Sequence, residues 1–292
     1  MYKEYTQEEL TRLHRIMLDM LRDFDRICRK HKIRYFAIDG TALGAVRHKG
    51  YIPWDDDIDI AMLRPDYNRL LSVYKEEFGD RYTLFSPEAE NKYYNFVPIL
   101  SKNNTRMIVP LSKDVFDTGI FIDIFLYENI PDDRALADRY IDKCYFWRNI
   151  YVMGRANFEL LYPGATAGQK IKYTIAGVVR KIMSRVDPDG NKVRRMYMKQ
   201  IMKYAGKTKT YTVLGDPYAK DVIMHRDEFF PIVRLPFEDF DMPVMNQYLE
   251  NLRRKYGEDY MQLPPKEKRI NHCPYILEFD VKQPSDTGAG GR

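Results

Sequence analysis

Apolar residues recur at three- and four-residue intervals through residues 6–30, which predicts an amphipathic helix. Thr6 and Glu9 have the spacing of a capping box, which marks where this helix begins. Shorter apolar runs then predict strands, at residues 34–38, 57–62, 82–86, 95–100, 105–109 and 119–127. Helices are predicted between or after these runs, at residues 41–48, from Pro65 to before Gly79, and at 244–256. The alternation predicts an α+β protein, with a mixed sheet as its core and helices on its flanks.

The second half of the chain has a different pattern from the first. Residues 132–206 are mostly helical in pattern, with interruptions near Pro163-Gly164 and at 187–190, and Gly206 is a plausible helix stop. We therefore expect four parts. Residues 1–131 form a core with its N-terminal helix, and residues 132–206 form a helical insertion. Residues 207–283 complete the core, and residues 284–292 are a disordered tail.

Composition excludes several classes of protein. Of the 292 residues, 45% are hydrophobic and 30% are charged, which is enough apolar content for a folded core. The net charge of +5 is mild and argues against a nucleic-acid partner. Three cysteines give neither a disulfide framework nor a zinc signature. The N-terminus lacks the apolar stretch of a signal peptide, so a cytoplasmic location is expected.

Four aspartates lie within five positions of the predicted strand that ends at Met62. Side chains alternate along a strand, so Asp55, Asp57 and Asp59 share one face. Their charges repel at this spacing, and a bound divalent cation such as Mg²⁺ relieves the repulsion. An acidic surface turn that is solvated, or that binds structural Ca²⁺, remains the alternative at this point.

A further carboxylate, Asp123, lies at the centre of the apolar run 121–125. A buried carboxylate is costly unless a partner or a metal balances it, and a structural arginine is the alternative partner. If this strand pairs beside 57–62, Asp123 completes a three-carboxylate site. The Gly40-Thr41 turn opens a predicted helix, whose backbone N–H groups either hold a phosphate or are simply capped.

Taken together, these motifs resemble a known family. The string DGTALGAVRHKGYIPWDDDIDIAM at 39–62 is similar to that of the LicD phosphotransferases, which are related to the fukutin proteins and have the nucleotidyltransferase fold. GIFIDIF at 119–125 is similar to the next motif of the family. The runs LPFEDFDMPV at 235–244 and YGEDYMQLPPKEKR at 256–269 are similar to its closing motifs.

The resemblance implies transfer of a phosphorylated alcohol from a CDP-activated donor, most often phosphocholine from CDP-choline. The acceptor would be a sugar hydroxyl of a cell-surface glycan such as teichoic acid or lipopolysaccharide. By position, Asp57 and Asp59 would hold Mg²⁺ (or Mn²⁺), and Asp123 would be the third carboxylate, as a metal ligand or as the base for the acceptor hydroxyl. Asp55 would be secondary, and Asp56 would face away from the metal and be structural.

Other residues in the matched motifs are implied to bind the donor phosphates or nucleotide, and these are Gly40, Thr41, Arg47, His48, Glu238, Arg269 and His272. An arginine can hold two phosphate oxygens at once. Structural pairing remains the alternative for the charged members of this set. Asn271-His272-Cys273 stands where the family pattern is richer in histidine, which makes the assignment of His272 depend on the structure.

Two further features bear on the partners. A choline head group would need aromatic side chains, for which there are two candidate clusters, Tyr93, Tyr94 and Phe96 or Tyr145, Phe146 and Trp147. Core or interface packing is the preferred explanation for both clusters, and the sequence does not select a cage. Residues 168–185 have an apolar centre among basic residues, which predicts either contact with an anionic membrane near a lipid-linked acceptor or an ordinary packed helix.

Two rival functions use the same residues. A nucleotidyltransferase that moves NMP from an NTP to a sugar or another small acceptor would need the same carboxylates. A metal-stabilised binding module would keep the cation and have no turnover. The sequence leaves open the alcohol carried, the acceptor glycan, the number of metal ions and the oligomeric state.

Overall fold

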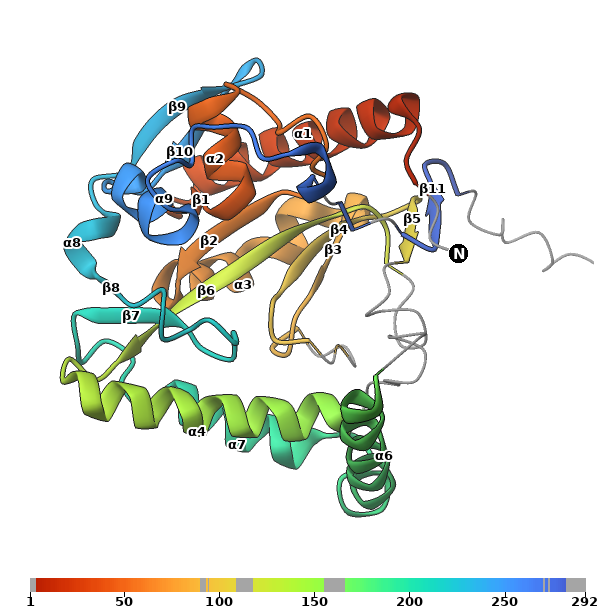
Figure 1. The fold of residues 1–292 in the computed structure, drawn as a ribbon, viewed down its shortest axis with the longest axis vertical. Helices are drawn as coiled ribbons and strands as arrows, with labels where there is room; N and C mark the ends of the chain where they lie inside the picture. The colour runs from red at the N-terminus through yellow and green to blue at the C-terminus, as the bar shows by residue number, and fades with distance from the viewer. Residues whose placement is uncertain are drawn as a thin grey trace, which may run out of the picture.

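The computed structural model describes residues 4–89, 93, 95–108, 118–154, 166–269, 271–272 and 274–281, and it confirms the α+β class. One mixed sheet forms the core, with the strand order β3-β4-β6-β2-β1-β10-β9, and β7 joins β6 and β8 beside this path (Figure 1). The strands are β1 (Phe36–Ala37), β2 (Asp59–Leu63), β3 (Tyr82–Phe85), β4 (Ile99–Lys102), β6 (Phe121–Ile130), β7 (Thr210–Val213), β8 (Met224–His225), β9 (Val233–Phe237) and β10 (Phe240–Val244). A separate two-stranded sheet pairs β5 (Arg106–Ile108) with β11 (Ile276–Glu278).

The helices lie on both sides of this sheet and beyond one end of it. They are α1 (Gln7–Lys30), α2 (Asp39–Arg47), α3 (Arg64–Phe78), α4 (Arg134–Met153), α6 (Ala167–Val186), α7 (Asn191–Ile201), α8 (Arg226–Phe229) and α9 (Tyr248–Tyr256), with short 3-10 turns at Gly79–Arg81 and Lys266–Lys268. The predicted capping box of α1 is present: Glu9 N–H donates to Thr6 Oγ1 at 3.1 Å, and Thr6 N–H donates to the Glu9 carboxylate at 2.9 Å. One face of α1 is buried in the main core, as the spacing of its apolar residues predicts.

The strands differ from their predicted bounds where the sheet ends. The run predicted as a strand from residue 57 enters the ladder only at Asp59, and the run predicted at 95–100 pairs over Ile99–Lys102. The reason lies in β6, because the residues before it turn away from β2. Ile120 and Thr118 accept backbone hydrogen bonds from Lys102 and Met107, at 2.7 Å each, instead of continuing beside residue 57.

The helices of the predicted insertion form a layer at one end of the sheet, drawn at the bottom of Figure 1. Helices α4 and α7 pack together over a small core of their own, which also takes in Ile130 and Leu214. The predicted interruption at 187–190 is confirmed, since Gly190 has a φ of +64° and begins α7. The interruption expected at Pro163-Gly164 and the tail expected at 284–292 lie outside the residues that the structure describes.

Candidate active site

The two motif aspartates that are far apart in sequence lie side by side in the sheet. Strands β2 and β6 are parallel, and Asp59 and Asp123 are direct partners in their register. The N–H of Asp123 donates to the carbonyl of Ile58 at 3.0 Å, which fixes the start of this pairing. Neighbouring strands are about 4.8 Å apart, so the two carboxylates project from adjacent positions. The condition on which Asp123 completes the carboxylate site, that its strand pairs beside that of Asp59, is met.

Alternation of burial continues into the loop before β2. Asp55, Asp57 and Asp59 are half-buried, whereas the intervening Asp56 and Ile58 are buried. Asp55 and Asp57 lie close enough to share a hydrogen bond between their carboxyl groups. The local pattern therefore orients these side chains as predicted, although residues 55–58 are not part of the ladder.

The four carboxyl groups of this cluster destabilise one another's charged forms. Burial, followed by the charge of Asp57, raises the pKa of Asp55 and of Asp123 to about 8. The pKa of Asp57 is also raised, and that of Asp59 is raised well above its usual range, in both cases chiefly by burial. A set of buried oxygen ligands that repel one another suits a hard divalent cation, which restores the charged forms of the carboxylates.

Helix α2 positions this cluster through its first turn. The Thr41 hydroxyl, which is buried, accepts a hydrogen bond from the N–H of Asp59 at 2.8 Å, and the N–H of Ile38 donates to the carbonyl of Asp59 at 3.1 Å. A Cβ at Gly40 would lie 2.5 Å from the Asp55 carboxylate, so glycine makes room for that side chain. Direct contact of Gly40 and Thr41 with a donor phosphate stays a prediction.

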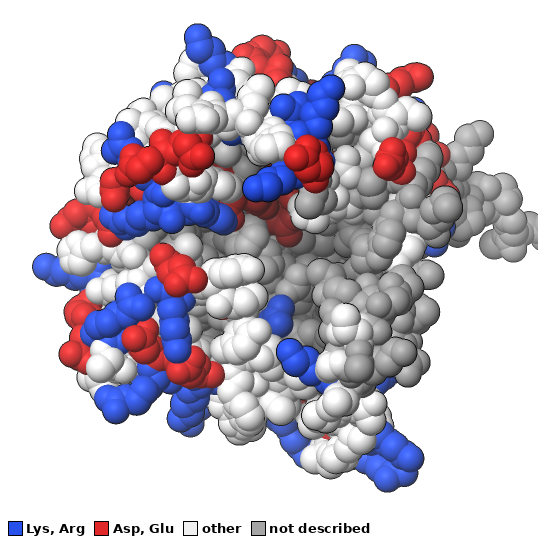
Figure 2. All heavy atoms as spheres, viewed as in Figure 1, with Lys and Arg blue, Asp and Glu red and all other residues white. Residues whose placement is uncertain are grey.

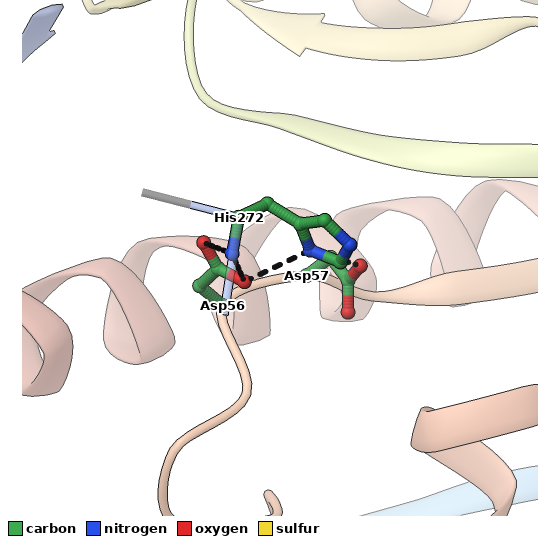
Figure 3. A group of neighbouring side chains, drawn as sticks. All are labelled: Asp56, Asp57 and His272. Atoms are coloured by element: carbon green, nitrogen blue, oxygen red, sulfur yellow. Dashed lines mark hydrogen bonds and ion pairs between the residues drawn. The ribbon is translucent and has the colours of Figure 1, made fainter. Parts of the chain in front are cut away.

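A second cluster joins Asp56 to the N-terminal segment through Tyr5 and to the C-terminal segment through His272, and Figure 3 shows Asp56 and Asp57 with His272. Asp56, which is 1% exposed, accepts hydrogen bonds from the Tyr5 hydroxyl at 2.8 Å and from the N–H of His272 at 3.0 Å. His272 Nδ1 lies 3.1 Å from Asp56 and 3.3 Å from Asp57. The hydrogen bond to Asp56, together with the charge of Asp57, raises the pKa of His272 to about 9.

Within the described ranges, the metal-ligand atoms of Asp56, Asp57 and His272 all lie within 4.8 Å of one another. Asp56 was expected to face away from the metal, but its carboxylate lies close enough to those ligand atoms to be a candidate ligand itself. The His272 imidazole is placed either to pair with the two carboxylates as a cation or, when neutral, to ligate a metal together with them. The residues of this site fit a divalent cation, and Asp57 belongs to both sets of candidate ligands.

Basic side chains predicted to bind the donor gather beside Asp55. Arg47 donates to two backbone carbonyls of the loop after α9, at 2.9 and 3.1 Å, and to His48 Nε2 at 3.0 Å. The guanidinium of Arg269 lies 4.6 Å above the ring of Trp54. Burial lowers the pKa of Arg47, and the charge of Arg269 lowers it further. Two neighbouring guanidinium groups that repel each other are a suitable site for an anion.

Glu238 is placed apart from these groups. Its carboxylate accepts a hydrogen bond from the N–H of Tyr51 at 3.1 Å, and its own N–H donates to the carbonyl of Lys49 at 2.7 Å. A Cβ at Gly50 would lie 2.1 Å from the Glu238 carboxylate. The structure therefore shows Glu238 holding the loop after α2, and its predicted contact with the donor stays a prediction.

Three residues near the carboxylates were not singled out from the sequence. Asp39 has a φ of +51°, forms an ion pair with Lys255, and lies near enough to raise the pKa of Asp57 and Asp59. Burial and the charges of the aspartates, Asp39 foremost, raise the pKa of Tyr256. Asp39 begins the motif string, which was a usable signal, whereas nothing local marks the end of α9 as part of the site.

The two aromatic clusters proposed for a choline head group pack against the helical layer instead. Phe96 lies 4.8 Å from the ring of Tyr151 and 3.9 Å from that of Tyr197. The Tyr151 hydroxyl donates to the carbonyl of Tyr93, and Trp147 packs against the same small core. Core packing, the alternative given for these clusters, is what the structure shows for Tyr93, Phe96 and Trp147. Tyr145 is half-buried, Phe146 is 55% exposed, and Tyr94 lies outside the described residues.

The structure thus places Asp59 of the Asp-x-Asp pair beside Asp123 of a parallel neighbouring strand, with Asp57 in the loop before β2. Residues 32–133 match the family model described as the nucleotidyltransferase domain of LicD/FKTN/FKRP. The resemblance to the LicD family is thereby confirmed, and Asp55, Asp57, Asp59 and Asp123 all fall within the matched residues.

The chain is 28% identical over 267 residues to a Haemophilus influenzae protein named lipopolysaccharide cholinephosphotransferase LicD, across 88% of this chain and 93% of that protein. It is also 28% identical over 142 residues to an uncharacterized protein of Rickettsia prowazekii, across 49% of this chain and 46% of that protein. The first similarity extends well beyond the residues that match the nucleotidyltransferase domain.

Proposed function

We propose that this protein is a phosphotransferase that moves a phosphorylated alcohol, phosphocholine in the first instance, from a CDP-activated donor to a sugar hydroxyl of a cell-surface glycan. The observation that carries the proposal is the register of β2 and β6, which sets Asp59 directly beside Asp123 with Asp57 close by. The similarity to a cholinephosphotransferase over most of both chains supports this choice of donor and acceptor.

In this proposal, Asp57 and Asp59 would hold Mg²⁺ or Mn²⁺, with Asp55 in a supporting role, and Asp123 would be either a third ligand or the base. The cation would neutralise the donor phosphates and polarise the phosphorus that is attacked. Arg47 and Arg269 bind the diphosphate, aided by His48, and thereby align the leaving CMP. The acceptor hydroxyl attacks phosphorus in line, its oxygen forms the new P–O bond, and the bond to the CMP oxygen breaks. A carboxylate of the cluster, Asp123 in the first place, takes the proton of that hydroxyl.

The experiment is transfer from CDP-choline to a lipopolysaccharide or teichoic-acid acceptor with Mg²⁺, following CMP release and phosphocholine on the glycan. Asp57→Ala and Asp59→Ala should each lower turnover roughly 100-fold or more, because each removes a metal ligand. Asp189→Asn, an exposed aspartate in the turn before α7, is the matched control. Chelation with EDTA should abolish turnover, and added Mg²⁺ should restore it.

Near-wild-type turnover in both Ala variants would contradict the proposal. Release of pyrophosphate from an NTP, with no use of a CDP-alcohol, would instead identify nucleotidyl transfer. Cation binding without turnover on any donor would identify the non-catalytic binding module.

We also propose that α6 brings the enzyme to an anionic membrane surface, where a lipid-linked acceptor would be found. The described part of the chain contains no helix with the length and apolar character needed to cross a bilayer. Helix α6 instead exposes an apolar stripe at helical spacing, with exposed fractions of 64%, 55%, 55%, 53% and 57% at Ile171, Ile175, Val178, Ile182 and Val186.

The opposite face of α6 is attached to the body of the protein. Ala176 is buried, and Met183 approaches Gly154 at the end of α4. The sequence of α6 contains basic residues and no acidic residue. At 3.6 residues per turn, Lys172 flanks one edge of the stripe, and Lys181 and Arg185 flank the other. An apolar stripe between basic edges is the arrangement of a helix that lies in the plane of an anionic membrane.

Flotation with vesicles tests this contact. Wild-type protein should bind vesicles that contain phosphatidylglycerol, and not vesicles of phosphatidylcholine alone. The double variant Ile175→Glu/Ile182→Glu should lose at least about tenfold in binding, because it places two charges in the acyl boundary. Leu136→Glu, a comparably exposed apolar position on α4, is the control, and thermal midpoints check folding. Wild-type protein that stays unbound on anionic vesicles would remove the membrane contact.

A further inference from the structure

A cavity of about 440 Å³ opens beside the carboxylate cluster. Its walls come from β6, from Ile38 and Asp39, from the segment between β7 and β8, and from α9. This volume is in the range of small-molecule sites. The face drawn in Figure 2 is hollowed, and both acidic and basic side chains gather around the hollow.

The cavity adjoins the reacting centre through two residues. Phe125 lines the cavity and lies two residues after Asp123 on β6, so the two side chains are on the same face of the strand. Asp39 also lines it and is near enough to Asp57 and Asp59 to raise the pKa of both. A group attached to a phosphate at the carboxylate cluster would therefore need only a short link to reach this cavity.

The side chains that line the cavity carry more negative than positive charge. Lys255 forms an ion pair with Asp39, and Arg254 is paired with Glu228 at 2.6 Å, so both cations have partners of their own. Two further lining carboxylates, Asp216 and Asp221, have no ion-pair partner among the residues described. Asp216 accepts a hydrogen bond from the N–H of Tyr218 at 2.6 Å. This bond shapes the turn that carries Asp216, Tyr218 and Asp221.

The remaining lining is aromatic and aliphatic. Phe125 is half-buried, Tyr127 is buried, and Tyr218 is 68% exposed at the edge of the cavity. Val222 and Met224 add aliphatic surface. Aromatic faces and carboxylates together attract an alkylated cation, because the ring quadrupole and the acidic charges both favour positive charge while the methyl groups need apolar contact.

The neighbouring basic cluster has the complementary character. Arg47 and Arg269 attract anions beside Asp55, whereas the cavity is reached through Asp39 and Phe125. A donor with a diphosphate at one end and a quaternary ammonium at the other would match this division of charge.

We propose that this cavity is the head-group site of the donor, that it takes a quaternary ammonium group, and that Asp221, Tyr218 and Phe125 determine selectivity for that group. This inference rests on the proposed function, since it takes the donor phosphate to lie at the carboxylate cluster. The choline-type cation occupies the aromatic and acidic cavity, and the phosphorus lies over Asp59 and Asp123.

The test compares CDP-choline with a neutral analogue in which a tert-butyl group replaces the trimethylammonium group. The selectivity is the ratio of kcat/KM for the two donors. Asp221→Asn and Tyr218→Leu, both at exposed positions that should tolerate change, should each lower this ratio by about tenfold. Phe125→Leu should do the same from the wall of the cavity. Asp189→Asn is the matched control and should leave the ratio unchanged.

The outcomes separate the two proposals. An unchanged ratio in all three variants, with wild-type transfer intact, would overturn the head-group site and leave the proposed function standing. If the wild type transfers neither donor, the proposed function fails, and calorimetric titration of choline chloride then decides the site. Choline binding to the wild type that is weakened in Asp221→Asn would support the site, and no choline binding to the wild type would overturn it.

Discussion

Neighbouring residues in the aspartate-rich segment have different surroundings because their side chains point to opposite sides of the chain. Asp57 faces the carboxylate cluster, while Asp56 is buried with Tyr5 and His272. The cluster also depends on small groups that hold it in place, of which the Thr41 hydroxyl is the clearest example, since it is the acceptor for the N–H of Asp59. At the scale of single residues, individual hydrogen bonds therefore decide which aspartate faces the carboxylate cluster and which is held in a structural contact.

Thr41→Val should therefore affect both stability and turnover. Valine has nearly the same shape but offers no acceptor, which leaves the N–H of Asp59 unpaired at a cost of about 1–3 kcal/mol in the free energy of unfolding. Turnover should fall roughly tenfold because Asp59 is no longer held in place. Urea denaturation and steady-state kinetics measure the two effects. Thr41→Ser keeps the hydroxyl and should restore both, and a valine variant with wild-type values would show that this contact does not position Asp59.

Elements are joined in this fold by contacts at their ends as well as by apolar faces. The last turn of α1 meets the last turn of α3 through Glu77, which lies 2.5 Å from Lys30 Nζ and 2.6 Å from His31 Nε2. Hydrogen bonds from Lys30 and His31 lower the pKa of Glu77. These contacts join the ends of α1 and α3, and α1 packs its buried face on the main core, against β6.

The stabilisation from Glu77 should depend on pH in a definite direction. A carboxylate whose pKa is lowered on folding adds stability above its unfolded pKa, about 4.3, and loses it as the pH falls through the lowered folded value. The thermal midpoint of the wild type should exceed that of Glu77→Gln at pH 6, by the modest amount typical of a surface ion pair, and the gap should close towards pH 3. Thermal scans over this range measure it. A gap that is constant with pH would show that the charge of Glu77 is not its source.

For the molecule as a whole, the site depends on segments from both ends of the chain meeting at Asp56. Tyr5 precedes α1, Asp56 precedes β2, and His272 leads into β11, which pairs with β5. The C-terminal segment that carries Arg269 and His272 is thus tied to the aspartate loop by one buried carboxylate. The position of Arg269 beside Arg47 should therefore depend on the hydrogen bonds between His272 and Asp56.

Asp56→Ala should loosen the C-terminal segment without unfolding the core. Hydrogen bonds to a charged group contribute about 1.5–3 kcal/mol each, so amide exchange in Ile276–Glu278 should accelerate at least about tenfold. Exchange in the central strand β6 should change far less. Hydrogen exchange with mass spectrometry measures both regions, with Asp189→Asn as the control. Equal protection of Ile276–Glu278 in wild type and variant would show that other contacts hold this segment.

Much of the site follows from local pattern. The capping box and apolar spacing fixed the first helix, and alternation along 55–59 oriented Asp55, Asp57 and Asp59 before any strand pairing was known. The motif string around these residues was sufficient to indicate the family. These features depend on residues a few positions apart, whose geometry is set by the helix and strand periods alone.

Tertiary structure alone decided which distant residues meet. The adjacency of Asp59 and Asp123, the approach of His272 to Asp56, and the cavity walled by Phe125 and Tyr218 each join segments far apart in the chain. Such pairings depend on the register of the parallel strands and on packing over the whole core, and no local period encodes either of them. The sequence by itself therefore determined which groups are available for chemistry, and the pairing of the strands with the packing around them determined which of these groups act together.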